Sequence, residues 1–403
     1  MTLHPEPGPL RVEPHRMPWG ETTVTVVDAT GVPVWGLNLY HLLELRNAGK
    51  SVAMQQRYMS AIVDATNWAR ASGIDLEDRI EALEFLSYGE TKALQAHLQL
   101  NRQYEGGVAV GNAYWKDRCR AVRNFVSWRA LEPLQRIVWA DDRYLEARLK
   151  LDRFCDTVAS GIGRHKTFRV LGLTEDQQTA LLFAVIPGSA LNPFEARHQQ
   201  RNFAIVLSLY ELGCRAGELL GLKRGDLVLS GSRPILTIER RQNDPDDPRS
   251  RPANAKTLAR PLPVSAPLAS VLETWTTKHR PVKANYPGAN RSPYVFVSGE
   301  GAAMSSNTLE YIFKRLRSVE GVPADLTAHK LRHTWNDRFS KLVDADLAEN
   351  LRTEMATRVR NFLNGWKASS TQGERYTHRF VEEKGHEMML KLQSLSTAGA
   401  ARS

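Results

Sequence analysis

Seven polar or aromatic side chains spread between residues 215 and 376 constrain the fold of this chain more than any other feature. In chain order they are Arg215, Glu218, Lys256, His329, Arg332, Trp366 and Tyr376. His329 and Arg332 are three residues apart, a spacing that places both side chains on one face of a helix. A fold that uses the seven side chains together must bring distant segments of one domain to a single point.

These residue types suit one kind of chemistry, the displacement of an oxygen from a phosphodiester. Arg215 and Arg332 each present a fixed fork of donors that matches phosphate oxygens. The phenol of Tyr376 can form a covalent phosphoester and later leave again. The indole N–H of Trp366 can do a job otherwise done by a histidine, and Lys256 can protonate the leaving oxygen. Because the covalent link conserves the bond energy, we expect no ATP, no metal and no other cofactor.

Each of these residues also has an ordinary structural explanation. A tyrosine near a chain end is usually a packing or surface residue. An arginine followed three residues later by a glutamate, as in Arg215 and Glu218, is usually an ion pair on a helix. Lys256 sits in a charged stretch, where exposure to solvent is the default. Only the order of the whole set favours a site.

Three short motifs carry a resemblance to a known family. They are His329-Lys-Leu-Arg-His-Thr334, Gly365-Trp366 and Arg375-Tyr-Thr-His378. Together with the upstream arginine they resemble the tyrosine recombinase (phage integrase) family over roughly residues 172 to 395. Two departures are visible: Gly213-Cys214 stands where Thr-Gly is usual, and the interval from Arg332 to Trp366 is longer than is common in the family. We expect an extra helical turn or loop between residues 341 and 361.

The resemblance implies a role for each residue. Arg215 and Arg332 are the pair that clamps the scissile phosphate, and Tyr376 is the nucleophile. His329 and Trp366 are additional donors to that phosphate. Lys256 is the general acid, and Glu218 is the acid that orients the site without contacting the phosphate.

The resemblance also implies a function and partners. The chain is expected to be a site-specific recombinase of a mobile element, which cleaves and rejoins double-stranded DNA through a 3′-phosphotyrosyl link and a Holliday junction. The active assembly is expected to be a homo-tetramer on paired sites, monomeric or dimeric off DNA, assisted by accessory DNA-bending proteins. Two alternatives are a type IB topoisomerase-like enzyme and a DNA-binding relative with impaired catalysis. The Tyr376-Thr377-His378 ending and the helical N-terminal half favour the recombinase.

Composition is consistent with a partner that is a polyanion. The 403 residues carry a net charge of +10, which biases the chain toward nucleic acid. No apolar run is long enough to cross a bilayer, and the N-terminus lacks a signal-peptide core. Three scattered cysteines are too few for a disulfide framework or a zinc site. We therefore expect a cytoplasmic protein without a membrane partner. The resemblance to the recombinase family implies a bacterial protein that is associated with the nucleoid when active.

The length favours two domains. Residues 1–36 form an N-terminal segment in which residues 1–20 are loose and 22–27 pair with 32–35 in a hairpin. Residues 37–154 form a helical core-binding domain, 155–172 a basic linker, 173–395 the catalytic domain and 396–403 a tail. The expected fold is mostly α with a small β-sheet, a helical domain being followed by a mixed α/β catalytic domain.

Two helices of the first domain, over residues 51–70 and 112–131, are predicted from apolar residues at helical spacing. Their aromatic residues are expected in the core. Their basic residues are either a solvated face or phosphate contacts, and the position in front of a recombinase-like domain favours the contacts. With the linker, the candidate DNA contacts are Arg57, Lys116, Arg120, Arg123, Arg164 and Lys166.

In the second domain Thr174 is predicted to cap a helix, and residues 204–212 to form an apolar helix leading to Arg215. Strands are expected on both sides of Lys256, and a third at 294–297. The acidic, proline-rich residues 243–248 are expected to form an exposed loop. Further helices are predicted at 271–279, 307–319 and 380–395.

Overall fold

The computed structural model describes residues 8–101, 107–161, 171–241, 244, 246–249, 252–253, 257–346, 353–367 and 369–370. The chain divides into two compact units, residues 1–167 and 168–403, which we call the N-terminal and the C-terminal unit. As predicted, the fold is mostly helical with small antiparallel sheets. No helix within the described ranges has the length and apolar character needed to cross a membrane.

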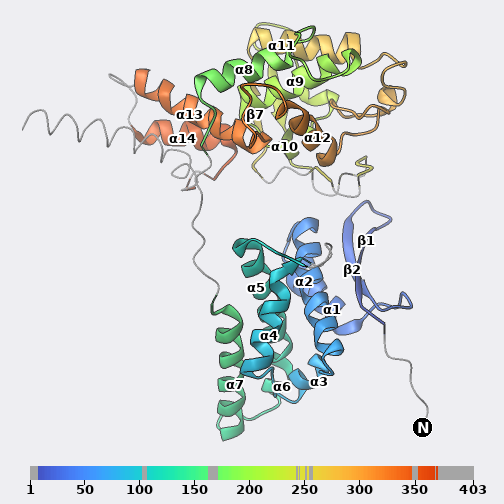
Figure 1. Cartoon of the computed structure of the whole chain (residues 1–403), viewed down its shortest axis with the longest axis vertical. Helices are drawn as coiled ribbons and strands as arrows, with labels where there is room; N and C mark the ends of the chain where they lie inside the picture. Colours follow the sequence, from blue (N-terminus) through green and yellow to red (C-terminus); the bar gives the residue numbers. More distant parts are fainter. Residues whose placement is uncertain are drawn as a thin grey trace, which may run out of the picture. The chain divides into compact units, whose positions relative to one another are not determined.

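The N-terminal unit is a helical bundle with a β-hairpin. Its elements are β1 (Arg11–Arg16), β2 (Thr22–Val27), α1 (Trp35–Tyr40), the π-helical turn η1 (His41–Arg46), α2 (Val52–Ala71), α3 (Leu76–Glu81), α4 (Tyr88–Gln99), β3 (Leu100–Asn101), β4 (Val108–Ala109), α5 (Asn112–Arg129), α6 (Leu131–Gln135) and α7 (Asp142–Ala159). Helix α2 packs on α4 and α5, and the hairpin lies beside α1 and α2 (Figure 1).

Both helices predicted from periodicity are present. On α5, Val122, Phe125 and Val126 recur at helical spacing and are all buried. Tyr40 of α1 meets the ring of Phe125 edge-on, with 5.3 Å between the centroids. The prediction that the aromatic side chains of α5 lie in the core is therefore right for Phe125 and wrong for Tyr114, which is exposed.

The hairpin differs from the prediction in its pairing. Strand 22–27 pairs with residues 11–16, in the register Arg11 with Val27 and Arg16 with Thr22, so the prediction that residues 1–20 are loose was wrong for 11–16. Residues 32–35 form no strand; they contribute one isolated bridge, from Pro33 to Val27. The sequence Arg-Val-Glu-Pro-His-Arg conceals an edge strand, where a proline is tolerated because one N–H side needs no partner.

The expected boundaries at residues 36 and 155 also differ from the structure. Leu10, Val24 and Val26 lie in the same core cluster as Leu37 and Ile62, so the hairpin belongs to the helical unit. Helix α7 continues to Ala159, which makes residues 155–159 part of the bundle and not of a linker.

The C-terminal unit contains the remaining elements. They are α8 (Glu175–Val185), α9 (Ala196–Leu212), α10 (Ala216–Leu220), the 3₁₀ turn η2 (Arg224–Asp226), β5 (Leu227–Val228), β6 (Ile235–Ile238), β7 (Arg260–Pro263), α11 (Ala266–Glu273), the π-helical turn η3 (Thr274–His279), η4 (Ala289–Arg291), α12 (Ser306–Leu316), α13 (Ala328–Asp346) and α14 (Thr353–Asn364). The strands form one antiparallel sheet in the order β5-β6-β7.

Helix α9 is the centre of this unit. Its side chains are buried around most of its circumference, among them Ile205, Val206 and Leu209, as expected of a helix enclosed by others. Helices α8, α11 and α13 pack against it (Figure 1). Thr174 caps α8 as predicted, in a reciprocal pair of bonds with Gln177.

One prediction in this unit was wrong and another was right only in part, since Asp246 and Pro248 of the acidic stretch are exposed but Asp247 is buried. Residues 294–297 form no regular strand; Tyr294 bridges Lys223 and Val297 bridges Ala303. In the acidic stretch 243–248, Asp247 is only 4% exposed, because Arg249 pairs with it through two bonds of 2.7 and 2.8 Å. The long interval between Arg332 and Trp366 is mainly helical where it is described, in α13 and α14.

Candidate functional site

The first predicted pair lies where α9 ends and α10 begins. Gly213 ends α9 in the left-handed conformation, with φ of 58°, which turns the chain toward Arg215. Arg215 precedes the short helix α10, and its backbone N–H donates to the Glu218 carboxylate at 3.0 Å. Its guanidinium lies 3.4 Å from the same carboxylate and is part-exposed. The local fold thus holds the Arg215 backbone firmly and leaves its cationic group accessible.

Glu218 is fully buried and surrounded by donors. Arg260 of β7 donates to it at 2.9 Å, and the Thr257 hydroxyl also donates to it. Burial alone would raise the pKa of Glu218, but the charge and hydrogen bond of Arg260 and the bond from Thr257 outweigh burial and lower it. Glu218 therefore stays ionised and holds the segments around it.

Helix α13 carries the second predicted pair. The Thr327 hydroxyl accepts from the N–H of Lys330 at 3.1 Å and caps the first turn, in which His329 lies. Arg332, one turn further, is 1% exposed and donates to the carbonyls of Gly213 at 2.6 Å and Asn364 at 3.0 Å. Since helix C-termini carry partial negative charge, these contacts stabilise the buried cation and join the ends of α9 and α14.

Trp366 lies directly beyond α14. Gly365 ends that helix with φ of 66°, and the N–H of Trp366 returns to the carbonyl of Asn361 at 2.8 Å. The indole is buried, and the guanidinium carbon of Arg332 lies 5.4 Å from its ring centroid. The structure therefore brings Trp366 to Arg332.

The two histidines of α13 share a hydrogen bond. The Nε2 atoms of His329 and His333 are 3.2 Å apart and the rings are nearly perpendicular. Burial first, then the charges of Arg332 and Arg215, lower the pKa of His329. Burial and the neighbouring cationic groups lower the pKa of His333 to about 4. The charges of Arg215 and Arg332 thus both act on the imidazole of His329.

The remaining predicted site residues, Lys256 and Tyr376, lie outside the described residues, as do Arg164 and Lys166. Their roles stay predictions. Thr257, which follows Lys256, is buried and bonded to both Glu218 and Arg260. In the part of the chain that is described, no group of His, Cys, Asp and Glu could hold a metal ion.

Sequence reasoning missed Arg260 and His333. Arg260 and Leu262 alternate with exposed residues along β7, so both face the core. A charged residue in phase with the inward positions of a predicted strand was the available signal. His333 was visible next to Arg332, but only the fold shows that it meets His329.

In the N-terminal unit, part of the predicted basic set gathers on two packed helices. Arg57 of α2 lies 3.4 Å and Arg120 of α5 3.2 Å from the carboxylate of Asp117, and both are more than 40% exposed. Lys116 is also exposed, whereas Arg123 is half-buried. Asp117 thus holds two candidate contacts at one place on the surface.

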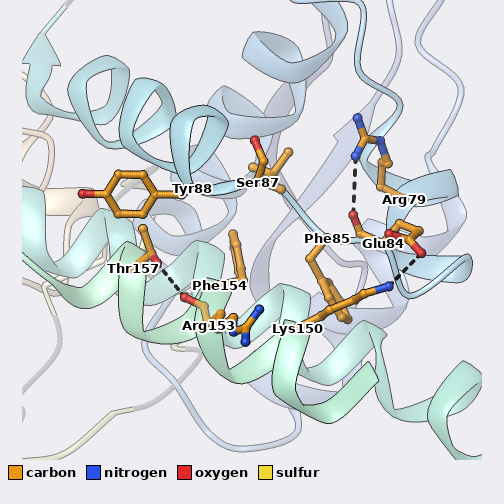
Figure 2. A pocket seen from close by; sticks show the side chains of 10 residues that line it. Arg79, Glu84, Phe85, Ser87, Tyr88, Lys150, Arg153, Phe154 and Thr157 are labelled. Atoms are coloured by element: carbon orange, nitrogen blue, oxygen red, sulfur yellow. Dashed lines mark hydrogen bonds and ion pairs between the residues drawn. The ribbon is translucent and has the colours of Figure 1, made fainter. Parts of the chain in front are cut away.

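A separate hollow of about 430 Å³ lies in the same unit and contains none of the predicted residues. Figure 2 shows Arg79, Lys150 and Arg153 around it, with Phe85 and Phe154 at its apolar side. Two of its three cations are paired: Arg79 lies 3.4 Å from Glu90, and Lys150 lies 2.9 Å from Glu84. Carboxylates therefore offset most of its positive charge.

The C-terminal unit is thus a mostly α-helical scaffold with a small sheet, in which Arg332 meets Trp366 and the end of the helix before Arg215. Residues 173–383, more than half of the chain, match the phage integrase family, and the chain belongs to this family.

Curated tyrosine recombinases are similar to the chain at low sequence identity. The chain is 27% identical over 135 residues to tyrosine recombinase XerC of Bradyrhizobium diazoefficiens, covering 34% of this chain and 36% of that protein. It is 27% identical over 190 residues to XerC of Bifidobacterium longum, covering 46% and 45%. The matched part thus spans less than half the length of these curated relatives.

Among solved structures, the chain is similar to the Tn1549 transposon integrase in complex with transposon right end DNA. The TM-score is 0.51 at 16% identity, over 85% of this chain and 93% of that chain. The same integrase with a circular intermediate DNA also gives 0.51, at 15% identity, over 88% and 99%. These similarities establish the fold.

Proposed function

We propose that the chain is a site-specific DNA recombinase that breaks and rejoins double-stranded DNA through a covalent tyrosine link. The phenolic oxygen of Tyr376 attacks the scissile phosphorus, and the bond from phosphorus to the 5′ oxygen breaks. Lys256 gives its proton to that oxygen, which leaves as a 5′-hydroxyl. In the reverse step, a 5′-hydroxyl of the partner duplex attacks the 3′-phosphotyrosyl link and releases the tyrosine.

One observation carries the proposal: the guanidinium of Arg332 binds the carbonyl of Gly213, close to Arg215 in the chain, at 2.6 Å. The same guanidinium lies 5.4 Å from the ring centroid of Trp366, and His329 stands one helical turn before it on α13. Such preorganised donors stabilise the charge that develops on a phosphorane, and this is usually the largest contribution to catalysis. A neutral His329 donates a hydrogen bond without adding a third full charge. Trp366 supports the phosphate pocket by packing on Arg332.

The partner we propose is duplex DNA, and the setting a mobile element. The net charge of +10 and the exposed pair Arg57 and Arg120 favour a polyanion. The similar integrase was solved with transposon DNA, which supports this choice of partner. Strand exchange between two duplexes through a Holliday junction needs four active sites, so we propose a homo-tetramer on paired sites, with accessory bending proteins where the DNA must be folded.

The experiment that tests the nucleophile uses a nicked suicide duplex with the element-end sequence that flanks the gene. The duplex is incubated with the protein without metal or ATP, then denatured. We expect a covalent protein–DNA adduct with the wild type and none with Tyr376→Phe. Salt-sensitive binding to the duplex without any adduct from the wild type would instead indicate a DNA-binding relative that has lost catalysis.

A second assay separates recombination from topoisomerase activity. Two differently labelled duplexes that carry the site are incubated together, and a supercoiled plasmid is treated in parallel. We expect exchanged strands and a four-way junction intermediate. Relaxed plasmid without exchanged strands would point to a type IB topoisomerase-like enzyme.

A further inference from the structure

Arg260 is a buried cation that donates to four groups, of which Glu218 and Leu363 are distant in the chain. Its side chain is 1% exposed and pairs with Glu218, whose side chain is fully buried. It also donates to the Leu363 carbonyl at 2.8 Å, the Thr257 hydroxyl at 3.1 Å and the Leu258 carbonyl at 3.3 Å. A buried ion pair is weak evidence for stability, since apolar residues of similar volume often serve as well. The arrangement therefore calls for a reason beyond stability.

The partners of Arg260 are next to the proposed site residues in three segments. Thr257 follows Lys256 directly. Glu218 holds the backbone of Arg215, and Leu363 lies in the last turn of α14, just before Trp366. The N–H of Leu258 also donates to the carbonyl of Gly365 at 3.1 Å. One guanidinium thus joins the segments that carry the proposed general acid, one phosphate arginine and the indole.

The chain before Lys256 is tied to the same helix. Arg249, paired with the buried Asp247, donates to the carbonyls of Leu220 and Met304, each at 3.0 Å, and lies over the ring of Tyr294. Leu220 and Glu218 both belong to α10. Arg249, which precedes Lys256 in the chain, and Arg260, which follows it, are therefore both bonded to α10, the helix that follows Arg215.

We propose that Arg260 is a positioning residue for the leaving-group step. Through its bonds to Thr257, Glu218 and Leu363 it fixes the residue that follows Lys256 relative to the neighbours of Arg215 and Trp366. This inference rests on the proposed function, in which Lys256 protonates the 5′ oxygen. Without Arg260, the phosphate pocket still forms from Arg215, His329 and Arg332, but the proton donor is misaligned. A misplacement of about 1 Å can reduce such a step by roughly 10²-fold.

The test compares two leaving groups. One suicide duplex has the ordinary 5′ oxygen at the scissile bond, and a matched duplex has sulfur there; a thiolate leaves without taking a proton. We expect Arg260→Met to slow adduct formation with the oxygen duplex by about tenfold or more, but with the sulfur duplex by less than about threefold. Arg260→Lys, which keeps the charge but not the fork, should lie between Met and wild type.

The matched control is Arg280→Met. Arg280 is also 1% exposed and donates to the backbone carbonyls of Ser292, Tyr294 and Val295, whereas Arg260 bonds to Glu218 and Thr257. It should lower stability without changing the ratio of sulfur to oxygen rates. If Arg260→Met slows both duplexes equally, or matches Arg280→Met in that ratio, the inference is wrong.

Two further variants keep the outcome interpretable. If Arg260→Met does not fold, Thr257→Val removes only the hydroxyl between Arg260 and Glu218, and should change the ratio in the same direction by a smaller amount. If Lys256→Ala shows no preference for the sulfur duplex, the general-acid role in the proposed function fails, independently of Arg260.

Discussion

At the scale of single residues, the contact between His329 and His333 determines which protons the two rings carry. Because their Nε2 atoms are 3.2 Å apart, one ring must donate and the other accept. The lowered pKa of both rings keeps them neutral near pH 7, so the pair remains a hydrogen bond and does not become two repelling cations. His333 thereby stabilises the orientation of His329 beside Arg332.

This contact predicts a pH dependence of stability. The native pKa of His333 is about 4, against an ordinary value of 6.5. The unfolded chain therefore takes up a proton first as the pH falls from 6.5 toward 4, and the free energy of unfolding decreases over that window. His333→Asn removes this titration. Denaturant titrations at about pH 7, 6 and 5 should show a smaller loss of stability for the variant, and equal losses would contradict the assignment.

At the scale of elements, the ends of helices build the site. Gly213 ends α9 and Gly365 ends α14, both in the left-handed conformation, and the carbonyls near these ends bind Arg332 and Arg260. A Cβ on Gly365 would lie 2.5 Å from Nη1 of Arg260 and 2.8 Å from Cβ of Thr257. Gly365 therefore both ends α14 and leaves room for the close approach of Arg260 and Thr257.

Gly365→Ala should consequently destabilise the protein by about 2 kcal/mol or more, from the left-handed backbone and from the clash together. Gly188→Ala is the matched control in the same unit, because Gly188 has φ of 82° but a Cβ added there would meet no described atom within 4 Å. It should cost only the backbone contribution of about 1 kcal/mol. Equal changes in the free energy of unfolding would show that the packing contact contributes nothing.

At the scale of the whole molecule, charge is arranged separately in each unit. In the N-terminal unit the exposed cations Arg57 and Arg120 share the carboxylate of Asp117, which offsets part of their charge. In the C-terminal unit Arg260 is buried and its charge is paired with the carboxylate of Glu218. A net charge of +10 thus does not reveal which basic residues are available to a polyanion.

If the N-terminal unit contacts DNA phosphates as proposed, Arg57→Ala and Arg120→Ala should each weaken binding to any duplex. Each lost contact should reduce the slope of log affinity against log salt by about 1. Asp117→Asn should act in the opposite direction and tighten binding, because it removes a negative charge from the same place. Fluorescence anisotropy over a salt series measures all three. A slope unchanged in both arginine variants would exclude this surface.

The sequence by itself determined the features that depend on neighbours a few residues apart. Apolar periodicity predicted α2 and α5, and Thr174 as an N-cap predicted the start of α8, since these signals arise from residues close together in the chain. The order of arginine, glutamate, lysine, histidine, arginine, tryptophan and tyrosine predicted the family, which the match over residues 173–383 confirms. The fold brings Arg332 to Trp366 and to the carbonyl of Gly213, close to Arg215 in the chain.

The tertiary structure decided the features whose partners are distant. The sequence did not predict strand 11–16. This strand is stabilised by its pairing with residues 22–27 and by the core on which it packs, and its own composition is not typical of a strand. The sequence did not show that Asp247 and Arg260 are buried. A charged side chain is buried only where the fold supplies oppositely charged or hydrogen-bonding partners. The partners of Arg260 lie 42 residues away in Glu218 and 103 residues away in Leu363, and only the folded chain brings them to one guanidinium.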